Sequence, residues 1–449
     1  MMSIIKIKKG LDINLKGAPV EEIVKLEISD LYAIKPSDFR SLPPKIVTKE
    51  GTKVKVGTVL FRDKYNEKIV FTSPVSGELI EIRRGDRRKI LEFIVKADKE
   101  FQYEEYKSGL ANSFSKEEII DQLLISGLWT RIVKRPYGVI PKIDQTPKDI
   151  HISTFDSAPL APNYNFTLKD SVSEFQAGVD ILTKLTTGKV HVNIDASVSN
   201  NIFNSIKNAQ INEFEGKHPA GLVGVQIHHT TPINKGEVVW TLNPQDVVFI
   251  GRLFNTGKLD FTKIIALSGS EIKEPKYYQI ISGAKIEDII KNNVQGDNVR
   301  IISGNVLTGS KIDKNGFIGS LDNIITVIPE GDQYEMFGWA KPGFNRYSTT
   351  RAYFTWFQKK RKWQLNTNIH GGERAFVVTG EMEKVLPMDI LPMHLVKAAL
   401  AEDIDMLENL GIYEVIEEDL ALCEFVNTSK IEIQNIIGNS IELMIKEME

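Results

Sequence analysis

Alternating apolar and polar residues dominate the stretch from residue 49 to residue 95. Its runs are KEGTKVKVGTVLF, KIVFTSPVSGELIEI and RRGDRRKILEFIV, and glycines stand between the valines and isoleucines at positions 51, 57, 77 and 85. A period of two is typical of half-buried strands, and glycine marks the turns between them. The pattern predicts a small all-β unit.

A helical pattern follows in SKEEIIDQLLISGLW, residues 115–129. Ser115 is followed three residues later by Glu118, which is the spacing of a capping box. In that motif, the serine side chain and the glutamate side chain each satisfy a backbone N–H group at the start of the helix. We therefore expect a helix to begin here.

Strand-like and helix-like runs alternate between residues 149 and 252. DIHIST and KVHVNID indicate strands, DSVSEFQAGVDILTKLTTG and a segment near residues 200–209 indicate helices, and the apolar runs LVGVQI and DVVFIG indicate two further strands. Strands separated by helices of this length are typical of a parallel, doubly wound sheet. This part of the chain is predicted to form a Rossmann-like α/β domain.

The remainder of the chain combines short strands with helices. KIIALSG, KYYQII, VRIISG and NIITVIP surround one helical run, AKIEDIIKN, which suggests a small α+β unit. Near the C-terminus, MDILPMHLVKAALAEDIDMLENL and KIEIQNIIGNSIELMIKEME have helical spacing.

A chain of 449 residues exceeds what one hydrophobic core usually supports, so we expect a multidomain α/β and α+β protein. The predicted units are an N-terminal β-rich region at residues 1–100, a Rossmann-like domain at 101–259, the small α+β unit at 260–330, and a basic, aromatic segment with a helical region at 331–449.

Composition narrows the classes of partner. Hydrophobic residues make up 42% and charged residues 26% of the chain, and the net charge is −3, so there is no general attraction to nucleic acid or to anionic lipid. Any partner must therefore be recognised by a particular patch of the surface rather than by the overall charge of the protein. The N-terminal MMSIIKIKKGLDINLKG has the pattern of neither a signal peptide nor an anchor, and no run reaches the roughly 18 apolar residues that a spanning helix requires.

The single cysteine, Cys423, excludes an intramolecular disulfide and any iron–sulfur or zinc site built from cysteines alone. A reducing cytoplasm is the natural compartment for such a chain. Within the helical run DLALCEFVNTSK, we expect Cys423 to act as a small buried hydrophobic residue.

Charge is distributed unevenly towards the C-terminus. Residues 341–374 contain eight lysines or arginines and one acidic residue, whereas residues 400–449 contain thirteen acidic residues and two lysines. Two solvated faces that complement each other within one molecule would explain this contrast, and so would an external docking surface.

The hairpin LFRDKYNEKIVFTSPVSGELIEI, residues 60–82, resembles the half of a biotinyl or lipoyl domain that carries the modified lysine. In those domains the lysine stands at the hairpin tip, about eight residues before the proline of the descending strand. Here that offset from Pro74 falls on Asn66, and Lys64 and Lys68 only flank it. We therefore expect an unmodified barrel-sandwich hybrid.

Nucleotide motifs are missing from the sequence. No G-x-G-x-x-G follows a strand, and no G-x-x-x-x-G-K-[ST] occurs. The turn STFDSAPLAP has bulky side chains and prolines where a pyrophosphate would need close backbone N–H groups. Asp156 and Ser157 are expected to cap the next segment. His228 and His229, at a predicted strand end, would face opposite sides and are interpreted as a structural pair rather than a shared metal site.

Residues 345–363, NRYSTTRAYFTWFQKKRKW, are the strongest candidates for a contact with a ligand or partner. The run alternates as a strand would, and an amphipathic hairpin that covers the core is the simplest structure for it. Its aromatic side chains and arginines also suit a quinone headgroup or a membrane partner. The candidate contact residues, with the neighbouring loop NIHGGERAF, are Arg346, Arg351, Phe354, Trp356, His370 and Arg374.

Several long stretches together resemble the A subunit of the bacterial Na+-translocating NADH:quinone reductase. They are IKIKKGLDINLKGAP, GLWTRIVKRPYGVIP, FDSAPLAP, HPAGLVGVQIHH, VVWTLNPQDVVFIGRLFNTGKLDFTKIIALSG and HGGERAFVVTGEMEKVLPMDILP. The resemblance covers nearly the whole chain. The architecture is also similar to the C subunit of Rnf complexes and to the flavin subunit of respiratory complex I, and residues 260–330 resemble their soluble-ligand-binding β-grasp module.

The chain departs from its flavin-binding relatives at two places. Where they have a glycine-rich loop of G-G-A-G-F-P-T type, this chain has Gly127, Leu128, Trp129, Thr130 and Arg131, whose side chains would fill the space of a flavin phosphate. Where they hold an iron–sulfur cluster, one thiolate is present, and a C-F/Y-V-C-P pattern of the family is reduced to CEFVN. The resemblance therefore implies no cofactor on this chain.

What the resemblance implies is a peripheral subunit on the cytoplasmic side of the inner membrane, held there by other subunits. The complex passes electrons from NADH, through flavins and iron centres on those other subunits, to ubiquinone or menaquinone and exports sodium. This chain would dock on the membrane subunits and contribute to quinone binding or access, without a catalytic centre or a nucleic-acid partner of its own. The alternatives are a biotin- or lipoate-type carrier and a soluble scaffold outside a respiratory complex.

Overall fold

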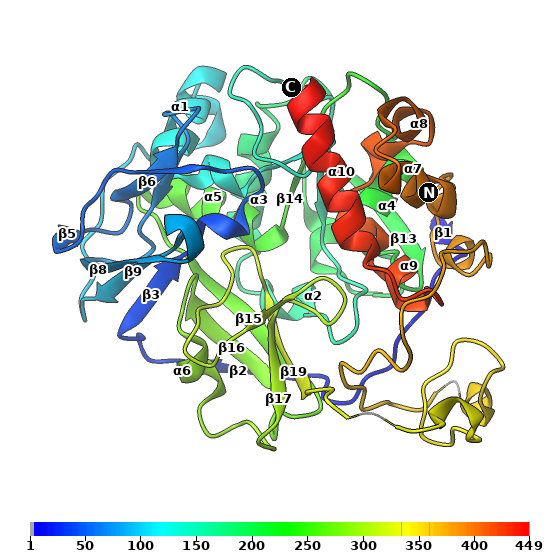
Figure 1. The fold of residues 1–449 in the computed structure, drawn as a ribbon. Coiled ribbons are helices and arrows are strands. Elements are labelled where there is room, and N and C mark those ends of the chain that lie inside the picture. The colour runs from blue at the N-terminus through cyan, green and yellow to red at the C-terminus, as the bar shows by residue number, and fades with distance from the viewer. Residues whose placement is uncertain (1–3, 334, 359, 449) are drawn as a thin grey trace.

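The computed structural model describes residues 4–333, 335–358 and 360–448. The structure contains four sheets, and in the view of Figure 1 the C-terminal helix passes in front of the α/β sheet. In the described part of the chain, no helix has the length and apolar character that crossing a membrane requires.

Two of the sheets form the small all-β unit that the alternating pattern predicted, which is the barrel-sandwich hybrid expected from the hairpin. Their strand orders are β3-β9-β8-β5 and β4-β6-β7. Phe61 stacks between Phe71, at a ring-centroid distance of 4.4 Å, and Phe93, at 4.5 Å, and so joins the two sheets. The strands are β3 (Leu31–Ile34), β4 (Pro44–Ile46), β5 (Thr52–Val54), β6 (Val59–Asp63), β7 (Val70–Thr72), β8 (Gly77–Arg84) and β9 (Ile90–Ala97).

The α/β domain is built on a six-stranded sheet of order β1-β13-β12-β11-β14-β10. The first five strands in that order are parallel, and β10 joins the edge antiparallel to β14. This confirms the parallel α/β fold. The strands are β1 (Ile5–Ile7), β10 (Val133–Arg135), β11 (Ile150–Ser153), β12 (Val190–Asp195), β13 (Gln210–Gly216) and β14 (Val239–Leu242).

Helices cover both faces of this sheet. On one face, α3 (Val172–Leu182) and α5 (Pro244–Thr256) pack with the strand residues Ile152 and Val192 in the main hydrophobic core. The two helices approach each other closely at Gly178, where a Cβ would lie 2.2 Å from the Val247 carbonyl oxygen. On the other face lies α4 (Val223–Thr230), whose Gln226 side chain reaches β11.

Two of the predicted strands were wrong, because LVGVQI lies in α4 and DVVFIG lies in α5. Short apolar runs do not distinguish a buried strand from a buried helix by period. For DVVFIG, the residues just before the run indicate a helix. Asn243 caps it by accepting a hydrogen bond from the backbone N–H of Gln245, and Pro244 occupies the first helical position. The helix predicted near residues 200–209 is only a 3₁₀ turn at Ile202–Ser205.

The capping box at the start of α1 (Lys116–Ser126) is confirmed. The Ser115 Oγ accepts from the Glu118 backbone N–H at 3.2 Å, and the Glu118 carboxylate accepts from the Ser115 backbone N–H at 2.8 Å. The helix ends earlier than predicted, because Gly127 adopts a left-handed conformation with φ 79°. A 3₁₀ turn at Leu128–Arg131 follows.

The β-grasp domain contains the predicted strands and helix and one strand from the N-terminus. Its strand order is β18-β17-β19-β15-β16-β2. The elements are β2 (Val20–Lys25), β15 (Thr262–Ser268), β16 (Lys276–Ile281), α6 (Ile286–Ile290), β17 (Val299–Ser303), β18 (Ser310–Ile312) and β19 (Ile324–Pro329).

The first 25 residues therefore do not join the barrel-sandwich hybrid with which the sequence interpretation grouped them. β1 pairs with β13 in the α/β sheet, and β2 pairs with β16 in the β-grasp sheet. These strands are short, and their partners lie some 200 residues or more further along the chain, so no local pattern indicates the pairing. The N-terminal segment therefore contributes one strand to each of two sheets, that of the α/β domain and that of the β-grasp domain.

The C-terminal region is helical, as predicted, and packs on the α/β domain. Its helices are α7 (Pro392–Leu400), α8 (Ile404–Asn409), α9 (Ala421–Val426) and α10 (Ile433–Met448). Leu395 and Ile437 share a hydrophobic core with Phe214 of β13 and Val225 of α4. The helical region is therefore part of the same folded body.

Candidate functional site

The chain makes a long excursion from the body between Glu330 and Trp363, and we call residues 332–362 the aromatic excursion. Figure 1 shows it as the yellow segment that extends away from the packed layers. Its return is fixed by Trp363, whose backbone N–H donates to the Asn14 carbonyl at 2.7 Å and whose carbonyl accepts from Lys16 N at 2.8 Å. Trp363 is 6% exposed. The base of the excursion is therefore anchored to the N-terminal segment.

The strand predicted for residues 345–363 was wrong, and so was the hairpin that would cover the core. Within the described residues of this run, the regular structure is a single 3₁₀ turn at Phe354–Phe357. A strand is stabilised by pairing with a neighbour, and the excursion lies away from the sheets (Figure 1). The alternating sequence of residues 345–363 therefore lacks the neighbouring strand that it would need to form a sheet.

Three of the six candidate contact residues lie close in sequence in the excursion, two of them in the 3₁₀ turn Phe354–Phe357. The Arg351 guanidinium lies over the Trp356 ring at 4.9 Å. Phe354, which is 60% exposed, stacks on Phe344 with ring centroids 5.8 Å apart. A cation and aromatic faces thus lie together at the surface, which is a geometry that suits flat, polarisable ligands or an interface.

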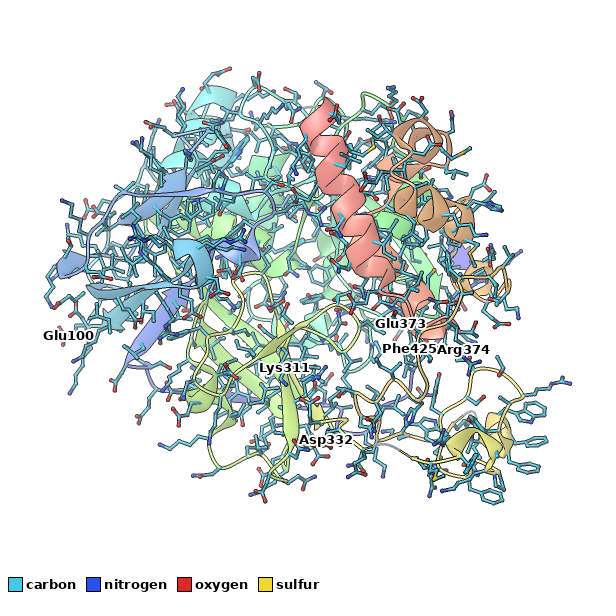
Figure 2. All side chains as sticks on the ribbon, in the orientation of Figure 1. Glu100, Lys311, Asp332, Glu373, Arg374 and Phe425 are labelled. Carbon is cyan, nitrogen blue, oxygen red and sulfur yellow. The ribbon has the colours of Figure 1, made fainter. Side chains whose placement is uncertain are left out.

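The other three candidates lie among basic residues, Arg346 within the excursion and His370 and Arg374 after its return. Partial burial lowers the pKa of His370, and the positive charges of Arg346 and Lys430 lower it further. Arg374, which is labelled in Figure 2, donates its backbone N–H to the Ser429 carbonyl at 3.0 Å. Burial, and after it the nearby Arg374, lowers the pKa of Lys430. The structure therefore divides the predicted contact residues into an exposed aromatic group and a basic group.

Among the described residues, no ion pair joins the acidic C-terminal region to this basic segment. In the described residues its carboxylates pair with other parts of the chain: Glu408 with Lys235, Glu417 with Arg40, and Glu418 and Asp419 with Arg135. Within the excursion, Glu335 pairs with both Lys341 and Arg346. These contacts favour an external partner for the basic segment.

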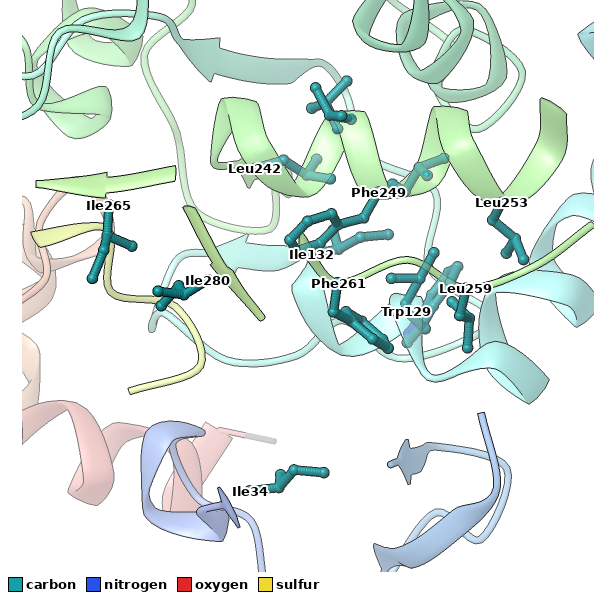
Figure 3. Close-up of a cluster of buried hydrophobic side chains, with 14 of the residues drawn as sticks. Ile34, Trp129, Ile132, Leu242, Phe249, Leu253, Leu259, Phe261, Ile265 and Ile280 are labelled. Atoms are coloured by element: carbon teal, nitrogen blue, oxygen red, sulfur yellow. The ribbon is translucent and has the colours of Figure 1, made fainter. Parts of the chain in front are cut away.

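A second region of interest is the junction where the resemblance to flavin subunits would place a phosphate-binding loop. Leu128 and Trp129 are fully buried there. The Trp129 Nε1 donates to the Pro141 carbonyl at 3.0 Å, and its ring meets Trp240 edge-on at 5.3 Å. Figure 3 shows Trp129 within a cluster that also contains Phe261 and Leu259.

Arg131 completes the filling of this junction. Its guanidinium donates to the Ser320 carbonyl at 2.7 Å, lies 3.5 Å from the Asp246 carboxylate, and stacks on Phe261 at 5.6 Å. The cavity that remains beside it has a volume of about 20 Å³. That volume accommodates a single water molecule.

Buried charges join the β-grasp domain to the α/β domain at the same place. Lys263 Nζ donates to the carbonyls of Ser320 at 3.1 Å and Asp322 at 2.6 Å. Burial, together with the nearby Arg131, lowers the pKa of Lys263 to about 8. These two bonds lie within the β-grasp domain, whereas the bond from Arg131 to the Ser320 carbonyl crosses to it from the α/β domain.

At the hairpin tip, Asn66 lies in the turn between β6 and β7, and Lys64 and Lys68 are exposed on either side of it. The Asn66 carbonyl accepts from Ile69 N at 3.0 Å. Cys423, far from this turn, is buried as predicted, and burial raises the pKa of its thiol.

His228 and His229 lie in α4 rather than at a strand end, so that prediction was wrong. His228 Nδ1 is 2.6 Å from a Glu414 carboxylate oxygen, and its Nε2 accepts from the Asp389 backbone N–H at 3.1 Å. His229 Nδ1 is 3.0 Å from the Val225 carbonyl. Both rings have hydrogen-bonding partners, which agrees with a structural pair.

The sequence interpretation missed a buried cluster of Asp149, His151 and His191, whose potential ligand atoms lie within 4.8 Å of one another. The signal was present, because His151 and His191 occupy the same position in the adjacent parallel strands β11 and β12. Residues in register on parallel strands face the same side of the sheet.

The geometry of this cluster does not suit a metal ion. The two imidazole rings are parallel, with centroids 4.3 Å apart. Their nitrogen lone pairs lie in the ring planes, so stacked rings direct them side by side rather than at one point. His151 Nε2 also contacts the Thr231 hydroxyl at 2.9 Å. Burial lowers the pKa of both histidines, which keeps the stack neutral near pH 7.

The fold defines the class: a multidomain α/β and α+β protein with a barrel-sandwich hybrid, a parallel α/β domain, a soluble-ligand-binding β-grasp domain and a helical C-terminal region. Family models match three of these parts: the NqrA N-terminal barrel-sandwich hybrid domain at residues 5–98, the NqrA second alpha/beta domain at 114–259, and the NQRA C-terminal domain at 264–314.

Full-length relatives agree with the domain matches. The chain is 38% identical over 434 residues to the A subunit of the Na(+)-translocating NADH-quinone reductase of Photorhabdus laumondii, which covers 95% of this chain and 96% of the relative. It is 37% identical over 446 residues to the protein of the same name from Neisseria meningitidis serogroup B, which covers 99% and 100%. The chain belongs to the family of A subunits of the Na(+)-translocating NADH-quinone reductase.

Proposed function

We propose that this chain is a cofactor-free, peripheral subunit of a Na+-translocating NADH-quinone reductase, on the cytoplasmic side of the membrane. The observation that carries the proposal is the 37% identity over 446 residues to an A subunit of that complex, with both chains covered almost completely. In this role the chain assembles with the membrane subunits, and electrons pass from NADH to quinone over flavins and iron centres that those subunits hold.

Three features of the chain support the absence of a redox centre on it. Trp129 and Arg131 occupy the junction in which a flavin loop would need open space. Cys423 is a single, buried thiol, and one thiolate does not hold an iron–sulfur cluster. Asn66 stands in the hairpin turn where a carrier domain would have its modified lysine.

Co-purification tests the proposal directly. The tagged chain, expressed in its own host and extracted from membranes in mild detergent, should retain the other subunits and their Na+-stimulated NADH–quinone reductase activity. Its intact mass should be that of the unmodified 50.6 kDa polypeptide. Isolation of the chain without any other subunit would exclude this function.

A double substitution of the hairpin lysines is the matched control for the carrier alternative. Lys64→Arg and Lys68→Arg keep both charges and remove both attachment nitrogens at exposed positions. If the chain is a structural subunit, complex yield and activity are unchanged. A biotin- or lipoate-type carrier would lose its modification and its activity together.

A quinone contact on this chain is a second candidate function, favoured by one observation. Arg351 lies over Trp356 at 4.9 Å, so a cationic hydrogen-bond donor adjoins an aromatic face, and Trp356 shares a 3₁₀ turn with the exposed Phe354. A quinone headgroup offers a flat ring and carbonyl acceptors, which this arrangement complements. The basic group around Arg346 and His370 offers further donors at the base of the excursion.

A photoreactive quinone analogue tests this contact on the isolated chain. Labelling should fall within residues 341–374, should be displaced by excess quinone, and should drop several-fold in a variant with Arg351→Gln and Trp356→Leu. The control is Arg87→Gln, an exposed arginine in the barrel-sandwich hybrid, which should leave labelling unchanged. Labelling that excess quinone does not displace would rule out a specific site.

A further inference from the structure

The aromatic excursion exposes large apolar side chains that the rest of the molecule buries. Phe344 is 65% exposed, Phe354 60% and Phe357 69%, whereas Phe61, Phe93 and Phe175 in the body are fully buried. Exposing several phenylalanine rings on one short segment costs hydrophobic free energy in water. Such a group of rings indicates a surface that is covered in the working state of the protein.

The same segment carries a local excess of positive charge. Residues 335–362 contain seven lysines or arginines and one acidic residue, in a chain whose net charge is −3. The acidic residue, Glu335, is already paired with Lys341 and Arg346. Arg351, Lys360 and Lys362 are exposed to solvent. The covering surface must therefore accept both aromatic rings and cations.

We propose that the aromatic excursion docks on the surface of an anionic phospholipid bilayer, with its phenylalanine rings among the headgroups and its lysines and arginines on the lipid phosphates. Charge complementarity identifies this occupant, because anionic leaflets attract polybasic segments. Tryptophan and tyrosine are enriched at this depth, and phenylalanines on surface-bound segments insert at the boundary of headgroups and acyl chains. The cores of protein–protein interfaces, in contrast, are depleted in lysine, and this segment combines its rings with Lys341, Lys360 and Lys362.

The anchoring of the excursion makes this docking directional. Trp363 is held by two backbone hydrogen bonds to the N-terminal segment, and the Gly331 N–H donates to the Thr367 hydroxyl at 2.7 Å. The rings of Phe344, Phe354 and Phe357 are thus presented on a fixed base. The contact would be reversible, because each cation near an anionic surface contributes only about a five-fold gain in partitioning.

Vesicle binding by the full-length chain tests this inference without any other subunit. The chain should sediment with vesicles of phosphatidylcholine and phosphatidylglycerol, and it should remain in solution with vesicles of phosphatidylcholine alone. Raising the salt concentration should release it, because screening weakens the attraction between cations and lipid phosphates. The inference extends the peripheral position proposed above, but its test does not depend on assembly of the complex.

Two variants separate the contributions of charge and rings. Changing Arg351, Lys360 and Lys362 to Gln should weaken binding to the anionic vesicles by at least ten-fold. The matched control changes Arg87, Arg88 and Lys89 to Gln, which alters the net charge equally on an exposed turn of the barrel-sandwich hybrid and should leave binding almost unchanged.

For the rings, Phe344→Ser with Phe357→Ser should weaken binding several-fold. The control is Tyr65→Ser with Leu110→Ser, since these side chains are 82% and 80% exposed elsewhere on the molecule. Circular dichroism confirms that each variant is folded.

Two outcomes would overturn the inference. The first is no binding to anionic vesicles, and the second is an equal loss of binding in the test and control variants. If the vesicles fail and the excursion variants instead lose the other subunits on purification, the surface is a protein interface. Co-purification that persists while vesicle binding fails would leave the proposed function intact and remove only the lipid contact.

Discussion

Replacing Arg135 with methionine should lower the free energy of unfolding by about 3–5 kcal/mol, the usual cost of leaving a buried charge without its partner. Arg135 is 1% exposed, and its guanidinium donates to the Asp419 carboxylate at 2.5 Å and to the Glu418 carboxylate at 2.5 Å. Burial alone would lower the pKa of Arg135, but the two carboxylates outweigh burial and raise it. The substitution removes the cation that these two carboxylates share.

The ion triad holds the helical C-terminal region on the α/β domain, so its loss should weaken that packing. Gly224 of α4 lies directly beside it, where a Cβ would be 2.2 Å from a carboxylate oxygen of Asp419. There is consequently little room for water to replace the guanidinium. Urea denaturation followed by tryptophan fluorescence, together with proteolysis of the C-terminal helices, measures the effect.

The control for this prediction is Arg83→Met. Arg83 also contacts two carboxylates, those of Glu81 and Glu92, but its side chain is 42% exposed. An exposed pair of this kind contributes about 0–1 kcal/mol, so the control should unfold almost as the wild type does. Replacing Arg135, Glu418 and Asp419 together by Met, Gln and Leu should recover part of the loss. Equal stability of the Arg135 and Arg83 variants would contradict a stabilising role for the triad.

Local signals in the sequence predicted local structure well. The capping box at Ser115, the alternating strands of residues 49–95 and the β-grasp strands are all present in the structure. In each case the residues that decide the conformation are neighbours in sequence. Residues 222–227 and 246–251 show the limit of this reasoning, because a short run of buried apolar side chains satisfies a strand and a helix equally.

Long-range pairing could not be predicted in the same way. Arg135 and Asp419 are 284 positions apart in the sequence. Strand β2 pairs with β16, and the sequence of the α/β domain lies between them. The stacking of His151 on His191 depends on the register of two parallel strands, which the sequence contains only as two similar runs. Such contacts follow from the topology, and topology is set by the sum of many weak preferences.

The sequence predicted the chemistry of the candidate site but not its exposure to solvent. Side-chain chemistry is readable residue by residue, so the bulk of Trp129 and the basic, aromatic character of residues 341–374 were available at once. Exposure is not readable in that way. The phenylalanines of the excursion were expected to cover the core, and only the three-dimensional arrangement shows that they face solvent.

Acid should destabilise this protein through His218, and the loss should be confined to the interval between pH 6.5 and about 4. His218 is 2% exposed, and its Nδ1 is 3.0 Å from the Ser157 hydroxyl. That hydroxyl also accepts from the Gly221 backbone N–H at 2.8 Å, and its own hydrogen is available to Nδ1 of a neutral imidazole. Burial lowers the pKa of His218 to about 4, from an ordinary value of 6.5.

The free energy of unfolding falls as the pH falls because the unfolded chain binds a proton at His218 more readily than the folded chain does. Above pH 6.5 the histidine is neutral in both states, and its contribution is constant. As the pH falls below 6.5, the unfolded chain takes up a proton that the folded chain refuses until about pH 4. The free energy of unfolding therefore falls by about 1.4 kcal/mol per pH unit, or about 3 kcal/mol over the interval. Burial also lowers the pKa of His151, which adds to the effect in the same direction.

His218→Asn isolates this contribution, because the asparagine carbonyl can accept the hydrogen of the Ser157 hydroxyl but does not titrate. The variant should be less stable than the wild type at pH 7, and the difference should shrink by about 3 kcal/mol as the pH falls to 4. Urea midpoints at a series of pH values measure it. His394→Asn, at an exposed position of α7, is the control and should show a constant difference. A difference between wild type and His218→Asn that stays constant with pH would show that His218 does not resist protonation in the folded protein.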